Sequence, residues 1–438
     1  MLGLDFPTVR ADLDFAGAHF PDVAVRYKGN GTFMESRGSL KRSLKIDLND
    51  GFPGRKLDGV TKLNLHNCVT DASRMNEVLS HRLFRDAGVP APRTAYAEVF
   101  LTVPGQHERR YLGLYSLVEN VDNSFASDRY GTKKGALFKP VTRQLFEDLG
   151  PDWAAYRQSY DAKTPVSKAE TQRVIDFARL VSHAADGEFA ARLADYLDLD
   201  AFARFMAVTV WLSTLDSILG VGQNYLVYLH PMTRQFHFIP WDLDHSFGQF
   251  PMVGTQEQRE TLSIRQPWQG ENRFLERVFR VPTFQRLYLA RLREFSETIF
   301  HPDRLHRQVD ELAAVLRPAV RAESEEKLAR FDRVVAGEPV VRNPFGLGAG
   351  AFAGPRGSEA GTGPSLPFGF PGGFGSPPKP IKGFVTARAR SVIDQLAGRA
   401  EGAVLSGPGF GGRGGRRTGE DLETPAVSAR ARSWGPPF

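Results

Sequence analysis

Hydrophobic and polar residues alternate with a period of two in two early segments of the chain, residues 23–27 and 44–48. A period of two places successive side chains on opposite faces of an extended backbone. Each segment is therefore predicted to be a half-buried β-strand. Further strands are predicted at residues 96–101 and 111–119, which are separated by a Pro104-Gly105 turn.

The spacing of apolar residues becomes helical between these strands. Apolar side chains recur with a helical period over residues 75–83, behind an N-cap at Asp71 or Ser73. Gly88 and Pro90 follow and end the helix. The pattern predicts one amphipathic helix packed on a small sheet.

The periodicity becomes mainly helical further along the chain. An irregular stretch, residues 216–224, leads to two short strands at residues 225–229 and 236–239, which are predicted to form a hairpin inserted among helices. Together these patterns predict an α+β fold. We expect a β-rich N-terminal lobe with one helix over residues 1–150 and a mainly helical C-terminal lobe over residues 151–336.

Composition separates two segments from this folded body. Residues 337–382 contain 12 glycines and 9 prolines among 46 residues, with phenylalanine as the main large apolar type. Such a segment cannot bury enough surface to offset the entropy of ordering it, so it is predicted to be a disordered loop. A helical pattern resumes over residues 383–400 and predicts a helix that returns to the body. The Gly/Arg-rich residues 401–438 are predicted to be a disordered tail.

The overall composition is that of an ordinary globular protein. Of 438 residues, 41% are hydrophobic and 24% are charged, which is close to average for a chain that can bury a sizeable core. Cys68 is the only cysteine, so an internal disulfide framework and a cysteine-based zinc cage are excluded. No stretch reaches roughly 18 uncharged apolar residues, so we expect no membrane span.

The net charge of the chain gives little information about its binding partners. The formal net charge of +6 is weak support for a polyanionic partner, and a nucleic-acid function is not expected because short Arg/Gly runs such as residues 411–417 are usually solvated linkers. The chain as written starts without the basic and apolar regions of a signal peptide, as a cytoplasmic protein would. Because it reads as a domain from its first few residues, a start further upstream, and with it secretion or an envelope location, stays open.

The sharpest local feature is a pair of carboxylates after an apolar strand. Asp242 and Asp244 follow residues 238–241, and in an extended segment a spacing of two puts both on one side of the chain. Mg²⁺ prefers hard oxygen ligands and usually takes one or two carboxylates together with nucleotide phosphates. The pair therefore predicts a metal site, although, taken alone, it fits an ordinary polar turn better.

An acid and an amide precede the predicted hairpin. Asp216 and Asn224 lie in the irregular stretch between a helix and the first hairpin strand. A proton-accepting acid, an amide ligand for a metal, a strand pair and a metal-binding acid follow one another in this order in kinases. Each residue alone is more simply explained as a turn cap or as a partner for backbone groups. The order supplies the specificity that single residues lack.

A lysine on the second predicted strand is a candidate for phosphate binding. Lys45 lies on the face opposite its apolar neighbours, after a turn with exposed amides that is predicted at Gly29 and Asn30. Such a lysine can reach the phosphates of a nucleotide held under the turn, with Glu77 on the predicted helix as its ion-pair partner. A solvated strand lysine is the alternative. Three other cations compete for the role, namely Lys41, Arg42 and Lys62.

Several segments taken together resemble the CotH kinase family, which is found widely in bacteria and is named for a spore-coat protein. The resemblance covers roughly residues 23–250, with a weaker match through the later helices to Leu396. No single segment would be specific, but the combination is. The segments that carry the resemblance are residues 26–31, 43–46, 83–92, 113–119, 224–225 and 239–244.

The resemblance implies a bilobal, atypical protein-kinase-like fold. Such a protein would bind ATP with Mg²⁺ or Mn²⁺ and phosphorylate serine or threonine of a protein substrate. By position, Lys45 is similar to the phosphate-binding lysine and Asp216 to the catalytic acid. The metal ligands implied by the resemblance are Asn224 and Asp242, with Asp244 supporting them.

The resemblance also places Glu119 near the hinge between the lobes, where adenine binds. The chain departs from common kinases at three points. No His-Arg-Asp triplet precedes Asp216, eight positions rather than five separate Asp216 from Asn224, and Asp242 begins Asp-Leu-Asp rather than Asp-Phe-Gly. These departures weigh on the assignment of the base more than on that of the metal ligands.

The competing hypothesis is a non-catalytic pseudokinase that serves as a scaffold in a coat or envelope assembly. Such a protein could bind nucleotide without turning it over, so turnover distinguishes the two classes. The joint presence of Lys45, Asp216, Asn224 and Asp242 argues against the scaffold.

Overall fold

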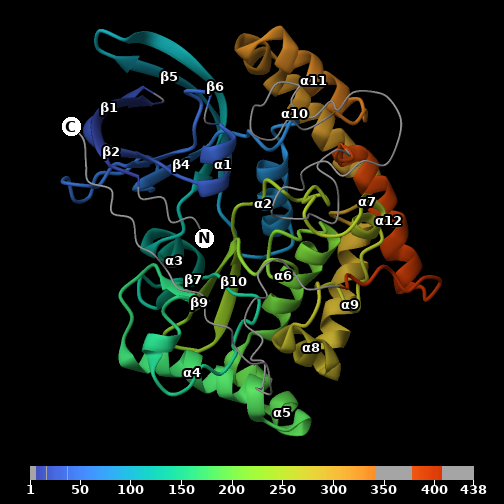
Figure 1. The fold of residues 1–438 in the computed structure, drawn as a ribbon. Coiled ribbons are helices and arrows are strands. Elements are labelled where there is room, and N and C mark those ends of the chain that lie inside the picture. Colours follow the sequence, from blue (N-terminus) through green and yellow to red (C-terminus); the bar gives the residue numbers. More distant parts are fainter. Residues whose placement is uncertain (1–5, 16, 37, 341–376, 407–438) are drawn as a thin grey trace, which may run out of the picture.

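The computed structural model describes residues 6–15, 17–36, 38–340 and 377–406 (Figure 1). It contains an antiparallel sheet followed along the chain by a smaller sheet among helices, so the expected α+β class is confirmed. The arrangement is consistent with two lobes. Most of the predicted Gly/Pro/Phe-rich loop and of the predicted Gly/Arg-rich tail fall outside the described residues.

A curled six-stranded antiparallel sheet, here called the N-terminal sheet, lies at the upper left of Figure 1. Its strand order is β1-β2-β3-β4-β6-β5. Val23, Ile46 and Leu63 come from three of its strands and are buried in one cluster. The strands are β1 (Val9–Phe15), β2 (Ala18–Tyr27), β3 (Leu44–Asp47), β4 (Lys62–His66), β5 (Thr94–Val103) and β6 (His107–Glu119).

The four strands predicted in this part of the chain correspond to β2, β3, β5 and β6, and the sheet contains β1 and β4 in addition to the prediction. Both additional strands carry the same period of two. β1 is an edge strand with mostly exposed residues, and its apolar residues occupy every second position from Val9 to Phe15. β4 is an inner strand with nearly all residues buried, and Leu63 and Leu65 alternate along it with polar residues.

The turn predicted at Gly29 and Asn30 is wrong as to the type of element, because Asn30 starts a short helix, α1 (Asn30–Glu35). Gly29 has φ of 75°, a left-handed conformation that glycine adopts without strain. A Cβ at this position would also meet the hydroxyl of Thr32. Gly29 therefore lets the chain leave β2 sharply and enter α1.

The predicted amphipathic helix is α2 (Asn76–Asp86). The predicted N-cap at Asp71 or Ser73 is wrong, because Met75 is the N-cap residue, but both predicted residues bond to the backbone at the start of the helix. Asp71 Oδ2 accepts a hydrogen bond from the backbone N of Asn76 at 2.8 Å, and Ser73 Oγ accepts one from the backbone N of Met75 at 3.1 Å. These bonds satisfy donors that have no partner inside the helix, so the first turn of α2 has a defined position.

A second, four-stranded sheet has the order β10-β9-β7-β8. The predicted hairpin consists of β9 (Tyr225–Leu229) and β10 (Phe236–Pro240). Two further strands, which are additional to the prediction, extend the hairpin, because β7 (Ala136–Pro140) pairs with β9 and β8 (Tyr160–Ala162) pairs with β7. Both added strands are short, and β7 is largely buried on both faces, so neither shows an alternation that predicts a strand.

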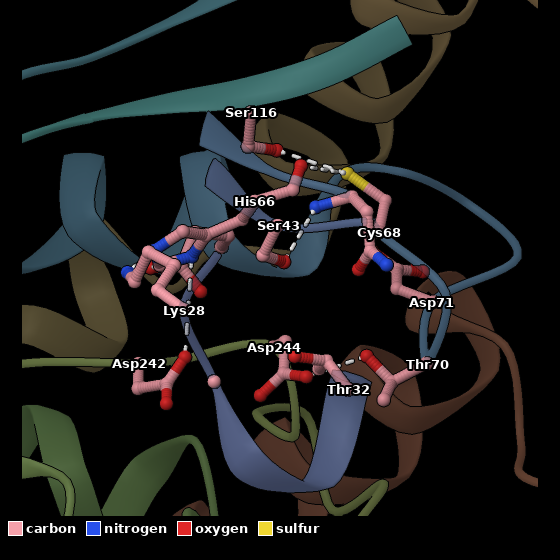
Figure 2. Close-up of a pocket in the computed structure, with 13 residues that line it drawn as sticks. Lys28, Thr32, Ser43, His66, Cys68, Thr70, Asp71, Ser116, Asp242 and Asp244 are labelled. Carbon is pink, nitrogen blue, oxygen red and sulfur yellow. Dashed lines mark hydrogen bonds and ion pairs between the residues drawn. The ribbon is translucent and has the colours of Figure 1, made fainter. Parts of the chain in front are cut away.

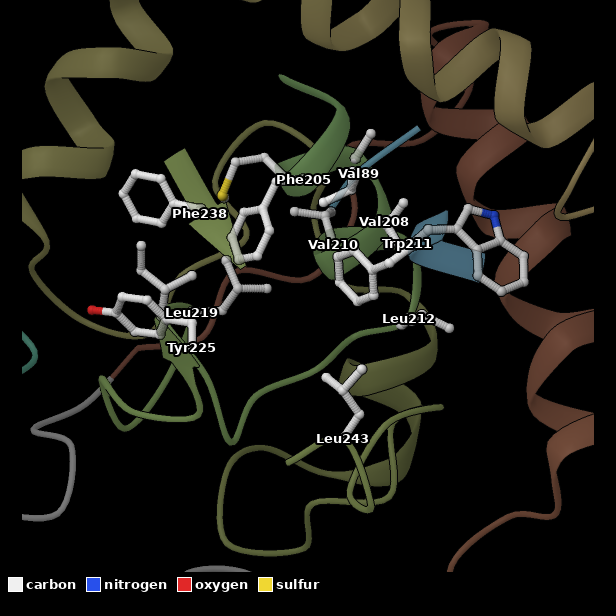
Figure 3. Packing of buried hydrophobic residues seen from close by; sticks show 14 of the residues in the cluster. Val89, Phe205, Val208, Val210, Trp211, Leu212, Leu219, Tyr225, Phe238 and Leu243 are labelled. Atoms are coloured by element: carbon white, nitrogen blue, oxygen red, sulfur yellow. The ribbon is translucent and has the colours of Figure 1, made fainter. Parts of the chain in front are cut away.

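Helices surround this second sheet and form the body below and beside the N-terminal sheet (Figure 1). In Figure 3, Phe205 of α6 (Leu199–Trp211) lies beside Phe238 of β10, with ring centroids 5.5 Å apart. Because α6 ends shortly before Asp216 and β10 ends shortly before Asp242, this shared core sets the starting points of both loops. The other helices from α3 to α9 are α3 (Asn123–Tyr130), α4 (Lys168–His183), α5 (Asp186–Tyr196), α7 (Gln256–Glu260), α8 (Arg273–Arg280) and α9 (Pro282–Glu297).

The chain returns to the body as α12 (Ile381–Leu396), close to the helix predicted over residues 383–400. Arg388 on α12 is fully buried, and its guanidinium donates to the backbone O of Val210 at 2.9 Å and of Leu262 at 2.6 Å. Val210 lies in the last turn of α6, whose final carbonyl groups have no partner inside the helix. Helix α12 therefore stabilises the end of α6 from which the next loop departs.

Helix α10 (Pro302–Glu323), which precedes α11 (Glu325–Val335), connects the body to the N-terminal sheet. The carboxylate of Glu323 is 1% exposed and accepts hydrogen bonds from Lys41 Nζ at 2.6 Å and from the backbone N of Leu114 at 2.9 Å. Arg74 lies 3.5 Å from the same carboxylate. The buried carboxylate of Glu323 thus joins the N-terminal sheet to the body through several hydrogen bonds and ion pairs.

Candidate functional site

A cavity of about 330 Å³, here called the larger cavity, lies where the N-terminal sheet meets the second sheet. Its wall combines apolar residues such as Val121 and Leu226 with an unusual number of cations. A concave site with apolar surface and clustered positive charge fits a phosphorylated organic ligand. The cations that line it are Arg26, Lys28, Lys45, Lys62, Lys139 and Lys163.

Lys45 lines the larger cavity, as its position on the strand predicts. Its Nζ donates to Oδ1 of Asn120 at 3.2 Å. Burial lowers the pKa of Lys45 to about 8, and the positive charges of Lys62 and Arg26 act in the same direction. The negative charge of a bound anion would raise the pKa of Lys45 again, so this group of cations favours anionic ligands.

Lys28 is a candidate residue to which the sequence argument assigns no role. It lines the larger cavity and also a smaller one of about 30 Å³, here called the smaller cavity. Its Nζ contacts Nε2 of His66 and lies 5.2 Å from the centre of the Trp241 ring. Burial lowers the pKa of Lys28 to about 8. The sequence feature that could have identified Lys28 is its position directly before Gly29 and Asn30, which also line the larger cavity.

Glu77 does not pair with Lys45, so the expected ion pair is wrong. The carboxylate of Glu77 lies 3.1 Å from His81 Nε2 and 3.5 Å from His66 Nδ1, and its Oε2 accepts a hydrogen bond from the backbone N of Leu243 at 2.9 Å. The first turn of α2 faces the loop after β10 rather than the cavity wall that carries the strand lysine. Strand and helix periodicity define faces, but they do not define which faces meet.

Asp242 and Asp244 both line the smaller cavity, and Asp242 lies on the same side as Lys28 (Figure 2). The extended backbone assumed from the sequence is wrong at Asp242, whose φ is 56°. The loop is instead shaped by contacts with the N-terminal part of the chain. Asn76 Nδ2 donates to the backbone O of Asp244 at 2.8 Å, and the hydroxyl of Thr70 donates to Asp244 Oδ2. These contacts hold both carboxylates at one cavity.

Asp216 lies near these two carboxylates, as the order of parts predicts. Its side chain is buried, and Gln223 Nε2 donates to its Oδ1 at 2.8 Å. Burial raises the pKa of Asp216 to about 6; His245 opposes this shift, whereas the charges of Asp244 and Asp242 add to it. Three acids from two loops therefore influence one another's charge.

Asn224 stands at the junction of the two loops. It is buried, has φ of 59°, and its backbone O accepts a hydrogen bond from the backbone N of Trp241 at 3.3 Å. Within the described parts of the chain, no hydrogen bond involves its side-chain amide. The amide oxygen of Asn224 and the carboxylates of Asp242 and Asp244, carried by the loops before β9 and after β10, make up a set of hard oxygen atoms. Such a set fits Mg²⁺ or Mn²⁺.

A second arrangement could also hold a cation. One ligand atom from each of His66, Glu77 and Asp242 lies within 4.8 Å of the others. The ammonium of Lys28, however, contacts Nε2 of the same imidazole ring. An ammonium can only donate, so Nε2 accepts and the ring proton sits on Nδ1, facing the two carboxylates. This geometry favours a hydrogen-bonded cluster over a metal bound to the histidine.

The side chain of Glu119 is directed away from both cavities. It pairs with Arg93 at 2.8 Å and with Arg129 at 3.3 Å, and it lines neither cavity. The residues that follow it, 120–122, line the larger cavity instead. The side chain of Glu119 is thus engaged by its two arginine partners, and an adenine site near this segment stays a prediction.

Comparison with known families gives a match over residues 25–334 to the model described as CotH kinase protein. The chain belongs to the CotH kinase family. The part that matches the CotH kinase model begins in β2 and ends within α11, so it contains the smaller cavity, all lining residues of the larger cavity except Phe6, and all three acids of the site. The returning helix α12 follows after the matched residues.

A curated relative of this CotH kinase family member is Inner spore coat protein H of Bacillus subtilis (strain 168). The two are 24% identical over 319 residues, which is 71% of this chain and 82% of that protein. None of the helices in the described part of the chain combines the length and the apolar content that a bilayer span requires.

Proposed function

We propose that this CotH kinase family member transfers the γ-phosphate of ATP to a serine or threonine hydroxyl of a protein, with Mg²⁺ or Mn²⁺. One observation carries the proposal. The basic cavity that contains Lys45 adjoins the acidic group formed by Asp216 and Asp242, although the three residues are far apart in the sequence. The proposal includes a kinase-like arrangement, with the N-terminal sheet and the helical body as the two lobes.

The larger cavity would hold the nucleotide. Its volume of about 330 Å³ lies within the usual range for small-molecule sites. Val121 and Leu226 offer apolar surface to the adenine base, and Lys28 and Lys45 offer ammonium groups to the phosphates. The carboxylates of the smaller cavity would then lie beside the phosphate end of the nucleotide.

The acids would act on the reacting groups. Asp216 accepts the proton of the substrate hydroxyl, and the hydroxyl oxygen forms a bond to the γ-phosphorus. At the same time the bond from the γ-phosphorus to the oxygen that bridges it to the β-phosphate breaks, and ADP leaves. A pKa of about 6 leaves Asp216 ionised at neutral pH and still basic enough to take this proton. Asn224 and Asp242 would hold the divalent cation, which neutralises charge on the phosphates.

A scaffold without catalysis is the second candidate, and the name of the relative, a spore coat protein, is the observation that favours it. A coat protein has to assemble with other proteins, whether or not it modifies them. The same name suits the kinase if its substrates are proteins of a coat. The two functions differ in one measurable property, because only the kinase would transfer phosphate from ATP.

The test is transfer of labelled phosphate from ATP to protein with Mg²⁺ or Mn²⁺ present. The Asp242→Ala variant should lose transfer, and the matched control Asp195→Ala, in a surface residue of α5, should keep it. Equal labelling by the wild-type protein and the Asp242→Ala variant would refute the assignment. Absence of transfer by the wild-type protein with every metal tried would favour the scaffold.

A further inference from the structure

Lys139 on β7 stands out among the cations of the larger cavity. Its neighbour Phe138 is fully buried in the main core, so the alternation of the strand turns Lys139 to the opposite face, where the cavity lies. β7 pairs with β9 up to Phe138 opposite Val227, and continuing this register by one residue places Lys139 opposite Leu226. The lysine thus lines the cavity from β7, near the loops that carry Asp216 and Asp242.

Within the described residues, Lys139 makes no hydrogen bond and no ion pair, whereas neighbouring cavity lysines do. Lys45 binds Asn120, and Lys62 lies 3.2 Å from an acid, Asp47. The residue opposite Lys139 on β8 is Asp161, but its carboxylate is taken by Lys163. An ammonium that is removed from bulk water without a partner costs free energy. An anionic ligand in the cavity would supply the missing partner.

The charges around Lys139 indicate which part of a nucleotide it would meet. Burial lowers its pKa, and the acids that oppose this effect are Asp242, Asp161 and Asp216. Two of these acids are the proposed metal ligand and the proposed base. Lys139 therefore lies in the cavity near both acids, and the transferred phosphoryl group has to pass close to the same two acids during in-line attack.

We propose that the ammonium of Lys139 is a catalytic group that binds the γ-phosphoryl group of ATP and stabilises the negative charge on its oxygens during transfer. This inference rests on the proposed kinase function. It also explains why a cation stands in a largely buried strand. A purely structural role, in which Lys139 only balances the buried acids, would affect nucleotides with and without a γ-phosphate equally.

The experiment compares the affinities of ADP and of a non-hydrolysable ATP analogue for the full chain with Mn²⁺. In the Lys139→Met variant the analogue should bind about tenfold more weakly, because one charged contact is lost, while ADP should stay within about twofold of wild type. Phosphate transfer at saturating ATP should fall by about two orders of magnitude. The matched control Lys168→Met, at the exposed start of α4, should change neither affinity.

A measurement on the unaltered protein covers the case in which the variant does not fold. Acylation of lysines, followed by mass spectrometry, should show Lys139 protected by the ATP analogue and not by ADP. Equal weakening of both nucleotides, or equal protection by both, would overturn the role of Lys139. If the wild-type protein shows this selective binding but transfers no phosphate, the kinase function fails and the γ-phosphate contact stands. If it binds neither nucleotide, both fail.

Discussion

The backbone N of Leu243 donates a hydrogen bond of 2.9 Å to Oε2 of Glu77. This bond joins the first turn of α2 to the loop that carries Asp242. The neighbouring Asn76 holds the same loop at a second point, through the backbone O of Asp244 at 2.8 Å. The position of α2 therefore determines where the carboxylates of the site lie.

Replacing Glu77 should impair the reaction through this loop. The Glu77→Ala variant removes the acceptor for Leu243 and leaves His66 without its nearest carboxylate. Loss of a residue that orients metal ligands typically costs 10- to 100-fold, so we expect kcat to fall by about that factor. Because Glu77 lines only the smaller cavity, KM for ATP should change by less than about threefold.

The control for this variant is Glu188→Ala, which removes an exposed glutamate of α5 that pairs with Arg192. Its kcat should equal that of the wild-type protein. A fall in KM and kcat together, or no change in either, would show that α2 does not act through the loop.

The pH profile of kcat/KM should be bell-shaped. Burial raises the pKa of Asp216 to about 6, so the base becomes protonated and the rate falls as the pH drops through this value. Burial lowers the pKa of Lys28 and of Lys45 to about 8, so the phosphate-binding charges are lost as the pH rises through this value. Initial rates at low ATP between pH 5 and pH 9, taken in roughly half-unit steps, check both limbs. A profile without an acidic limb would remove Asp216 from the role of base.

Glu323 should make stability depend on pH in the acid range. Burial alone would raise its pKa, but the charges of Arg74 and Lys41 and hydrogen bonds from Lys327 and Lys41 lower it to about 2. Because the folded pKa is below the ordinary value of 4.5, the stabilisation is present above pH 4.5 and is lost as the pH falls toward 2. Glu323→Gln should therefore cost about 3 to 5 kcal/mol at neutral pH and less at acid pH.

Urea unfolding at neutral pH and near pH 3 measures this difference. The matched control is Glu325→Gln, two residues further on, where the carboxylate is exposed and 3.9 Å from Arg321. It should change the free energy of unfolding by less than about 1 kcal/mol. A Glu323→Gln penalty that does not shrink with acid would contradict the ion-pair account.

Arg388 should be important for stability although it lies after the region matched by the family model. Arg388→Met leaves the backbone O atoms of Val210 and Leu262 without their donor in a buried place. Buried acceptors without partners cost about 1 to 3 kcal/mol each, so thermal unfolding should reveal a loss of about 3 kcal/mol. The exposed Arg390→Met on the same helix is the control and should be neutral. Equal stability of both variants would mean that α12 does not support α6.

The sequence predicts the elements whose patterns are local. The strands β9 and β10 and the helix α2 are confirmed because their periodicity and their punctuation by turn residues need no distant partner. β7 could not be found this way, since its apolar run is short and its pairing with β9 is set by the fold. Lys139 was overlooked for the same reason, because a lone lysine in such a run carries no signal of a cavity.

The site divides along a similar line. The order of Asp216, Asn224 and Asp242 along the chain is a local signal that points to one place, and the structure brings these residues together. The partner of Glu77 depends on how α2 packs against a loop more than 160 residues away in the chain, as the hydrogen bond from Leu243 shows. No pattern within either segment contains that information.

The most direct measurement of the central claim is a crystal structure with a non-hydrolysable ATP analogue and Mn²⁺. We expect anomalous density for the cation beside Asp242 and Asn224, phosphate oxygens within hydrogen-bonding distance of Lys45, and the γ-phosphate between Lys139 and Asp216. Nucleotide bound elsewhere, or a cation without contact to Asp242, would contradict the claim that these residues form one phosphoryl-transfer site.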